Sequence, residues 1–292
     1  MTNSQLGLRM EAEIQTQPDD WTRAAALNAP LPDPGQRVLA LGCGTSWFMA
    51  QSYAALREPH GLTDAFPASA APLDRQYEAA VIISRSGTTT EAIEAAQALA
   101  GRCTIIAIVA DPNTPLAQHA NQVIALDFAD ERSVVQTRFA TTALTLLRAS
   151  LGIDVSGSIA DARTALSMPL DPTAVQAEQL TFLGQGWTTG LAHEAALKNR
   201  EASQSWTESY PAMEYRHGPI SIAAPGRATW MIGAAPEGIP TQVTSTGAHY
   251  LAHTDLDPLA ELVLAQRVAL QRARQANLDP DNPRALTRSV IL

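Results

Sequence analysis

A short motif, Leu-Gly-x-Gly, occurs twice in the chain, at positions 41–44 and 183–186, and each copy follows a short apolar run. In each copy an alanine stands six residues after the second glycine, at Ala50 and Ala192. Other apolar runs alternate with helical segments, at 79–83, 103–110, 122–126 and 228–234. Continuous apolar strands that alternate with helices indicate parallel sheets covered on both faces. The pattern predicts an α/β chain of two similar halves joined near 169–172.

These elements also suggest domain boundaries. The segment 10–27 has helical character, and Pro18 is expected to interrupt it. We expect four parts in chain order: an N-terminal helix in 1–27, a first α/β domain in 28–168, a second in 169–280 and a C-terminal tail in 281–292.

Composition excludes several classes of protein. At 46% hydrophobic and 17% charged residues, the 292-residue chain is neither disordered nor fibrous. A net charge of −9 argues against a general nucleic-acid binder. No apolar run approaches the length of a membrane span, and no signal peptide is evident. Cys43 and Cys103 suggest neither a disulfide framework nor a zinc site. We expect a cytoplasmic protein without a metal, a cofactor, or a nucleic-acid or membrane partner.

The strongest local signal is Ser84-x-Ser86-Gly87-Thr88-Thr89, between an apolar run and a helical segment. A turn of this kind presents backbone N–H groups at a helix N-terminus, where an anion is favoured. Hydroxyl groups add donors without bulk, and Gly87 permits close approach to the backbone. An ordinary Ser/Thr helix cap is the alternative. Four hydroxyls exceed what a cap needs, so a phosphate site is favoured.

A second glycine-rich turn, Gly42-Cys43-Gly44-Thr45-Ser46, follows the first apolar run. Trp47 stands where a dinucleotide fingerprint would have its third glycine, so binding of a nicotinamide nucleotide is weakly supported. Ser46 offers a further phosphate donor, because ligands bind outside the carboxyl ends of parallel strands. A purely structural turn is equally compatible with this motif.

The 20 basic residues include a single lysine, Lys198, and the remaining 19 are arginine. Glu194, Lys198 and Glu201 follow i, i+4, i+7 spacing and share one helical face. A solvated ion-paired face would look the same. The surrounding alanines and leucines favour a buried site instead, in which a carboxylate beside an amine can transfer protons at carbon. From the residues alone, both interpretations remain open.

His217 precedes Gly218-Pro219 and must lie at a turn. A lone histidine is usually structural or exposed. It is a candidate acid–base group only if it reaches the same pocket as the carboxylates.

Together these motifs resemble the double sugar-isomerase (SIS) domain family, most closely the isomerase half of glucosamine-6-phosphate synthase and its stand-alone relatives. The resemblance covers nearly the whole chain and rests on spaced segments in the family's order: the opening helix at 10–18, the loops at 43–46 and 84–89, the segments at 194–201 and 214–219, and the tail at 281–290. It implies two tandem SIS domains, each a parallel sheet flanked by helices on both faces in a flavodoxin-like three-layer sandwich.

The resemblance also implies roles for individual residues. The sugar phosphate would be held by Ser46, Ser84, Arg85, Ser86 and Thr89. Glu201 would be the base that moves a proton between C1 and C2 through an enediol(amine), assisted by Lys198 and Glu194. His217 would open the sugar ring from the partner subunit of a homodimer. The second half lacks the serine-rich loop, so one phosphate site per chain is expected.

Two departures from the family pattern matter. The chain starts at the isomerase helix, so we expect no glutaminase domain. In the tail, Arg288 occupies the place of a family lysine that can meet the sugar carbonyl. Arginine stays protonated, so a tail imine is not expected, and Arg288 is a candidate tail contact.

The sequence therefore favours a phosphosugar aldose–ketose isomerase that acts on a sugar or amino-sugar 6-phosphate, with or without deamination. A non-catalytic phosphosugar-sensing protein is the alternative; the presence of both Glu201 and Lys198 favours an enzyme. The sequence does not distinguish isomerisation from deamination, since both share the enolisation step.

Overall fold

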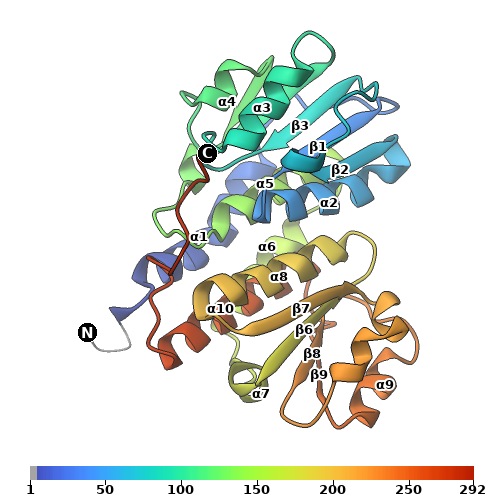
Figure 1. The fold of residues 1–292 in the computed structure, drawn as a ribbon, viewed down its shortest axis with the longest axis vertical. Coiled ribbons are helices and arrows are strands. Elements are labelled where there is room, and N and C mark those ends of the chain that lie inside the picture. The colour runs from blue at the N-terminus through green and yellow to red at the C-terminus, as the bar shows by residue number, and fades with distance from the viewer. Residues whose placement is uncertain (1–4) are drawn as a thin grey trace. The chain divides into compact units, whose positions relative to one another are not determined.

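A computed structural model describes residues 5–292 of the chain. Its contacts divide the chain into two compact units, neither of them continuous in sequence. The sheet A unit comprises residues 19–131, 138–155 and 287–292. The sheet B unit comprises the residues up to Pro18 together with 132–137 and 156–286. Each unit contains one parallel sheet with helices around it (Figure 1).

Sheet A has five parallel strands in the order β2-β1-β3-β4-β5. Its strands are β1 (Val38–Gly42), β2 (Thr63–Pro67), β3 (Ala79–Ile83), β4 (Thr104–Val109) and β5 (Gln122–Ala125). The four apolar runs expected as strands in this half are confirmed. β2 was not expected, because its sequence Thr-Asp-Ala-Phe-Pro is not a continuous apolar run. It lies at the sheet edge and is only partly buried, so its sequence carries no strong strand signal.

The helices of this unit are α2 (Thr45–Arg57), α3 (Thr90–Leu99), α4 (Pro115–Gln118) and α5 (Arg138–Ser150). Every residue of β1 and β3 is buried, so both faces of the central strands are covered. Alanines and leucines of α3, such as Ala92, Ala96 and Leu99, pack with Leu39 and Ile82 in one core cluster. The layered α/β arrangement predicted for this half is present.

Sheet B has four parallel strands in the order β7-β6-β8-β9. They are β6 (Gln179–Gly184), β7 (Trp206–Pro211), β8 (Ala228–Met231) and β9 (His249–Ala252). The helices of the unit are α6 (Ser156–Ser167), α7 (Pro172–Gln176), α8 (Thr188–Ser203), α9 (Ile239–Ser245) and α10 (Pro258–Gln275). α6 packs against α10 and so belongs with sheet B, whereas the sequence boundary at 168 had grouped it with the first half.

The two sheets repeat the same construction. In each, the first strand is flanked by the second and third, and the fourth lies beyond the third, the order of flavodoxin-like folds. β1 and β6 end at Gly42 and Gly184. A Cβ on Gly42 would lie 2.4 Å from the backbone of Ser46, and one on Gly184 would lie 2.2 Å from the carbonyl oxygen of Thr188. Both turns therefore require glycine so that the following helix can approach the strand end, which explains the repeated motif.

The first helix, α1 (Leu8–Ala25), runs through Pro18 without a break, so the expected interruption is wrong. Proline removes the N–H that would bond to the carbonyl of Ile14. The side chain of Gln17 supplies a substitute, because its Nε2 donates to that carbonyl at 3.2 Å. The helix start is capped by the distant residue Asp281, whose carboxylate accepts from the N–H groups of Arg9 and Met10 at 2.9 Å each.

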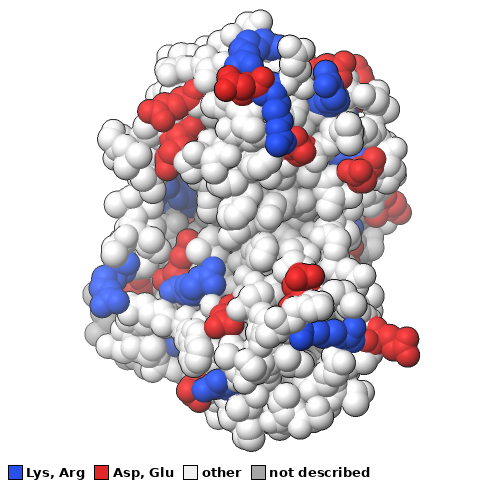
Figure 2. Space-filling model, turned by 45° about the vertical axis from the view of Figure 1, so that its right-hand side comes forward, with Lys and Arg blue, Asp and Glu red and all other residues white. Residues whose placement is uncertain are grey.

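Within residues 5–292, no helix is both long and apolar enough to cross a lipid bilayer. On the face drawn in Figure 2, acidic and basic side chains of the described residues are interspersed, and no extended basic area gathers there. That face offers no electrostatic footprint of the kind that polyanions bind.

Candidate functional site

The serine-rich loop lies between β3 and α3, as the sequence predicted. The hydroxyl of Ser84 accepts from the N–H of Gly87 at 3.2 Å, and that of Ser86 accepts from the N–H of Thr88 at 3.2 Å. Gly87 has a φ of +60°, and a Cβ there would lie 2.1 Å from the hydroxyl of Thr114. The loop is thus folded tightly on its own hydroxyls, and glycine is required at its apex.

The loop keeps hydrogen-bonding capacity for a ligand. Thr89 is the N-cap residue of α3, yet its side chain makes no capping hydrogen bond. The N–H groups of Ser86 and Thr89 have no hydrogen-bond partner among residues 5–292. The two side-chain hydroxyls lie 3.5 Å apart. Uncommitted donors at a helix N-terminus suit a bound anion, and the Thr89 hydroxyl does not make the bond to a first-turn N–H that an ordinary cap makes.

Arg85, which the family resemblance places among the phosphate ligands, is buried beside a carboxylate of the chain itself. Only 3% of the residue is exposed, and its guanidinium lies 3.7 Å from the fully buried carboxylate of Glu131. Glu131 also accepts from the N–H groups of Arg138 and Phe139 at the start of α5. Sequence reasoning missed Glu131; its one signal is an acidic residue placed shortly before a predicted helix.

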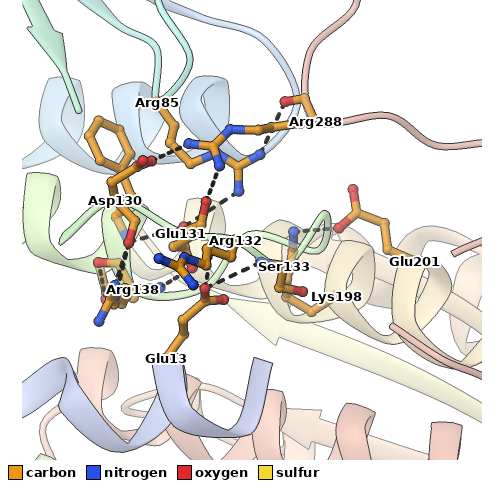
Figure 3. A network of polar contacts seen from close by, with 12 residues as sticks. Glu13, Arg85, Asp130, Glu131, Arg132, Ser133, Arg138, Lys198, Glu201 and Arg288 are labelled. Carbon is orange, nitrogen blue, oxygen red and sulfur yellow. Dashed lines mark hydrogen bonds and ion pairs between the residues drawn. The ribbon is translucent and has the colours of Figure 1, made fainter. Parts of the chain in front are cut away.

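Arg288 is joined to the same region (Figure 3). Its guanidinium forms an ion pair with Asp130 and donates to the backbone carbonyl of Glu131. Its own carbonyl accepts from Arg85 at 3.0 Å. Arg288 therefore contacts protein groups of the sheet A unit, and the expected contact of this tail residue with a substrate stays a prediction.

Ser46 lies in the first turn of α2 and is 5% exposed. The preceding Gly44 has a φ of +53°, so this turn also needs a glycine. Burial raises the pKa of the Cys43 thiol, and the carboxylate of Glu91 raises it further. A thiol in these surroundings is a poor nucleophile, and Cys43 is better explained as part of the turn.

The acidic and basic residues of α8 come together as their spacing indicated. The ammonium of Lys198 lies 3.5 Å from Oε1 of Glu194 and 2.5 Å from Oε2 of Glu201. The side chains of Glu194 and Lys198 are 0% and 1% exposed, whereas that of Glu201 is 20% exposed. The solvated-face interpretation is therefore wrong: two of the three groups are buried, and only Glu201 reaches solvent.

Glu201 faces a cavity of about 450 Å³ in the sheet B unit. Gln204 and Ser205 line it near the end of α8, and residues 284–286 of the tail line it as well. A cavity of this volume is in the range that holds small metabolites. The contact between the tail segment and the end of α8 has no signal in the sequence.

His217 ends a short 3-10 segment, Glu214–His217, that follows β7. The residue is exposed, and its side chain has no hydrogen-bond or ion-pair partner among the described residues. The structure therefore leaves its imidazole available without joining it to Glu201 by any contact.

The turn after β8 occupies the place in sheet B that the serine-rich loop has in sheet A. There the N–H of Gly233 donates to the carboxylate of Glu261 at 3.0 Å, and the indole of Trp230 donates to the same carboxylate at 2.7 Å. Glu261 is fully buried. A carboxylate of the chain itself thus takes up a backbone donor in this turn.

Within the described part of the chain, no three histidine, cysteine or acidic side chains are grouped as metal ligands.

The sequence matches no family model. It is similar to curated proteins named glutamine–fructose-6-phosphate aminotransferase [isomerizing]: 27% identity to that of Gluconobacter oxydans over 73% of this chain, and 26% to that of Sulfolobus acidocaldarius over 88%. The alignments cover 44% and 50% of those proteins, so the chain spans about half their length.

Solved structures are similar over nearly the whole chain. Glucosamine-6-phosphate deaminase from Thermotoga maritima superimposes with a TM-score of 0.82 at 23% identity, covering 97% of this chain and all of that one. Tagatose-6-phosphate ketose/aldose isomerase from Escherichia coli gives a TM-score of 0.77 at 18% identity, covering 100% and 98%. The chain has the α/β fold of these phosphosugar enzymes, with two parallel sheets flanked by helices.

Proposed function

We propose that the chain is a phosphosugar aldose–ketose isomerase that acts on a sugar or amino-sugar 6-phosphate, with or without release of ammonia. The observation that carries this proposal is Glu201 at the wall of a cavity, paired with the buried ammonium of Lys198 behind it. The similarity to proteins named for fructose, glucosamine and tagatose 6-phosphates supports the substrate class. We also interpret the two sheets as tandem SIS domains, supported by their common strand order and repeated glycine turns.

The serine-rich loop binds the phosphate group of the substrate in this proposal. The uncommitted N–H groups of Ser86 and Thr89 and their hydroxyls donate to phosphate oxygens, and the positive end of the α3 dipole adds attraction. Ser84 supports the loop through Gly87, and Ser46 offers a further hydroxyl. In the corresponding turn of sheet B, the N–H of Gly233 already donates to the carboxylate of Glu261. This contact supports a single phosphate site per chain.

Glu201 acts as the base. Its carboxylate takes a proton from the carbon beside the carbonyl and returns it to the neighbouring carbon, through an enediol or enediolamine. Lys198 holds this carboxylate in place and supplies positive charge where negative charge develops. Glu194 keeps the ammonium buried and oriented. Deamination differs in one further step: after the shared enolisation, water adds to the imine carbon at C2, the C2–N bond breaks, and ammonia leaves with a ketose as the second product.

Activity is tested with glucosamine 6-phosphate and other hexose 6-phosphates, following ketose and ammonia. We expect turnover of at least one, and a fall in kcat of about 10²–10⁴-fold in Glu201→Gln. Glu178→Gln, an exposed carboxylate of the same unit, is the matched control. Turnover equal in wild type and Glu201→Gln would refute the role of Glu201. Phosphosugar binding with no turnover would favour a sensing protein.

Substitution of Ser86 tests the serine-rich loop. Ser86→Ala should raise KM more than it lowers kcat, and Ser69→Ala, at an exposed serine, should change neither.

His217 is exposed, and we propose that it opens the sugar ring in the site of a second subunit. Glu201→Gln and His217→Ala are then each inactive alone. After mixing and reassembly, about a quarter of wild-type activity should return, because half of the dimers carry one intact site. No recovery from mixed dimers would contradict donation across a subunit interface.

A further inference from the structure

Residues 287–292, here called the C-terminal strap, lie along the serine-rich loop in the sheet A unit. The carbonyl of Val290 accepts from the N–H of Thr90 at 3.2 Å, and the N–H of Leu292 donates to the hydroxyl of Thr90 at 3.0 Å. The hydroxyls of Thr88 and Ser289 lie 2.8 Å apart. The strap thus occupies one of the N–H groups at the start of α3 and leaves those of Ser86 and Thr89 for a ligand.

Arg288 fixes the strap at its other end. One guanidinium nitrogen pairs with Asp130 and the other donates to the carbonyl of Glu131, while its own carbonyl accepts from Arg85 (Figure 3). The planar fork of arginine can meet two acceptors at once, and lysine cannot reproduce this geometry.

Arg85, which donates to the carbonyl of Arg288, belongs to a buried ion pair with Glu131. The side chains of Arg85 and Glu131 are 2% and 0% exposed, and Glu131 also holds the start of α5. Such a pair is rigid, because breaking it leaves a charge buried without compensation. Asp130 and Arg288 are each 42% exposed, so their pair is the accessible and weaker half of the arrangement.

We propose that Arg288 and Asp130 are positioning residues that hold the C-terminal strap against the serine-rich loop, and that Arg85 serves as the buried anchor of the strap rather than as a phosphate ligand. The strap sets the conformation in which the N–H groups of Ser86 and Thr89 point toward a bound anion. The effect of the strap on anion binding rests on the proposed function, whereas the holding of the strap does not.

The N–H of Thr90 is a direct reporter of the strap. It is among the first N–H groups of α3, which have no partner inside the helix, so Val290 provides its protection from exchange with water. In Arg288→Gln we expect its hydrogen exchange to quicken by about tenfold, as for loss of hydrogen bonds to a charged group. Asp130→Asn should quicken it by about threefold, in line with an exposed pair. The N–H of Ser84, bonded to Ile108 in the sheet, should not change.

The control variants distinguish the two-acceptor geometry of the Arg288 guanidinium from its positive charge. Arg288→Lys keeps the charge and should still quicken exchange at Thr90. Arg102→Gln removes an exposed arginine of the same unit and should have no effect. The double variant Asp130→Asn/Arg288→Gln should resemble Arg288→Gln alone, because the two residues act through one contact. Unchanged exchange at Thr90 in Arg288→Gln would refute the proposal.

A second measurement links the strap to the loop. Inorganic phosphate serves as the probe, and its Kd should rise about threefold to tenfold in Arg288→Gln while Arg102→Gln leaves it unchanged. With a sugar phosphate that proves to be a substrate, Arg288→Gln should raise KM and leave kcat nearly unchanged. Faster exchange with an unchanged phosphate Kd would refute the positioning role while leaving the strap contact in place. Faster exchange and weaker phosphate binding in a chain that turns over no sugar would instead count against the proposed function alone.

Discussion

Lys198 and Glu201 are joined at 2.5 Å, but the two side chains differ in surroundings: the lysine is 1% exposed and the glutamate 20%. The cation is therefore fixed inside the protein while its partner carboxylate can meet a substrate. Glu194, which is fully buried and lies 3.5 Å from the same ammonium, provides a second negative charge. A cation between two carboxylates keeps this part of α8 electrically compensated, which burial of a lone ammonium would not allow.

Replacement of Lys198 by arginine tests the need for an amine. We expect Lys198→Arg to lose most activity, because the larger guanidinium cannot occupy the same position between the two carboxylates. Overpacking should also cost about 1–3 kcal/mol in the free energy of unfolding. Lys198→Met should cost more, about 3–5 kcal/mol, because Glu194 remains buried without its cation, and adding Glu194→Gln should recover part of the loss. Wild-type turnover in a folded Lys198→Arg protein would show that any cation suffices.

The repeated glycines predict a contrast among alanine substitutions. Gly42→Ala and Gly184→Ala bring a Cβ within 2.4 Å and 2.2 Å of backbone atoms that cannot move without shifting a helix. Each should lower the free energy of unfolding by at least about 2 kcal/mol. Gly157 in α6 has open space at the same position, so Gly157→Ala should stabilise by about 0.4–1 kcal/mol. Chemical denaturation of the three variants measures this, and equal effects would contradict the close-approach explanation.

The Cys43 thiol is expected to react slowly. Its pKa is raised by burial and by Glu91, so less thiolate is present at neutral pH than in an unperturbed cysteine. Alkylation by iodoacetamide should be slower than for a model thiol at pH 7, and its rate should continue to rise above pH 9. Glu91→Gln should speed the reaction at a given pH. A fast reaction at pH 7 would indicate an activated thiol and would reopen a chemical role for this turn.

The lowered pKa of Asp171 predicts that the free energy of unfolding depends on pH in the acidic range. Burial alone would raise its pKa, but hydrogen bonds from the N–H of Ala174, from His249 and from the N–H of Thr173 together lower it. A carboxylate with a lowered folded pKa contributes stability that is complete above its ordinary pKa of about 4 and is lost as pH falls through the folded value. Asp171→Ala should therefore cost about 1 kcal/mol at pH 7 and less at pH 3. Asp171→Asn, which keeps a capping oxygen, should lie between the two proteins at pH 7.

Strands with continuous apolar sequences were predictable, because buried parallel strands need apolar residues on both faces. β2, β7 and β9 were not, since they are only partly buried and their sequences mix polar and apolar residues. α10 could have been found from Asp257-Pro258 at its start, where the carboxylate of Asp257 accepts from the N–H of Leu259.

The local part of the candidate site was equally accessible from sequence. The i, i+4, i+7 spacing on α8 predicted the grouping of Glu194, Lys198 and Glu201, because helical geometry alone brings them together. The partners of Arg85 and Arg288 were not predictable. Glu131 and Asp130 are distant from both in sequence, and only the folded chain joins them.

The capping of α1 by Asp281 has a consequence for how the chain is made. During synthesis, α1 lacks acceptors for two of its initial N–H groups until residue 281 has been added. Asp279 repeats the pattern, since its carboxylate accepts from the N–H of Gly7. Completion of this helix therefore waits for a residue 272 positions further along the sequence, a connection of high contact order. A nascent chain stalled before residue 279 should expose this helix start to proteases, and extension of the chain beyond residue 281 should protect it.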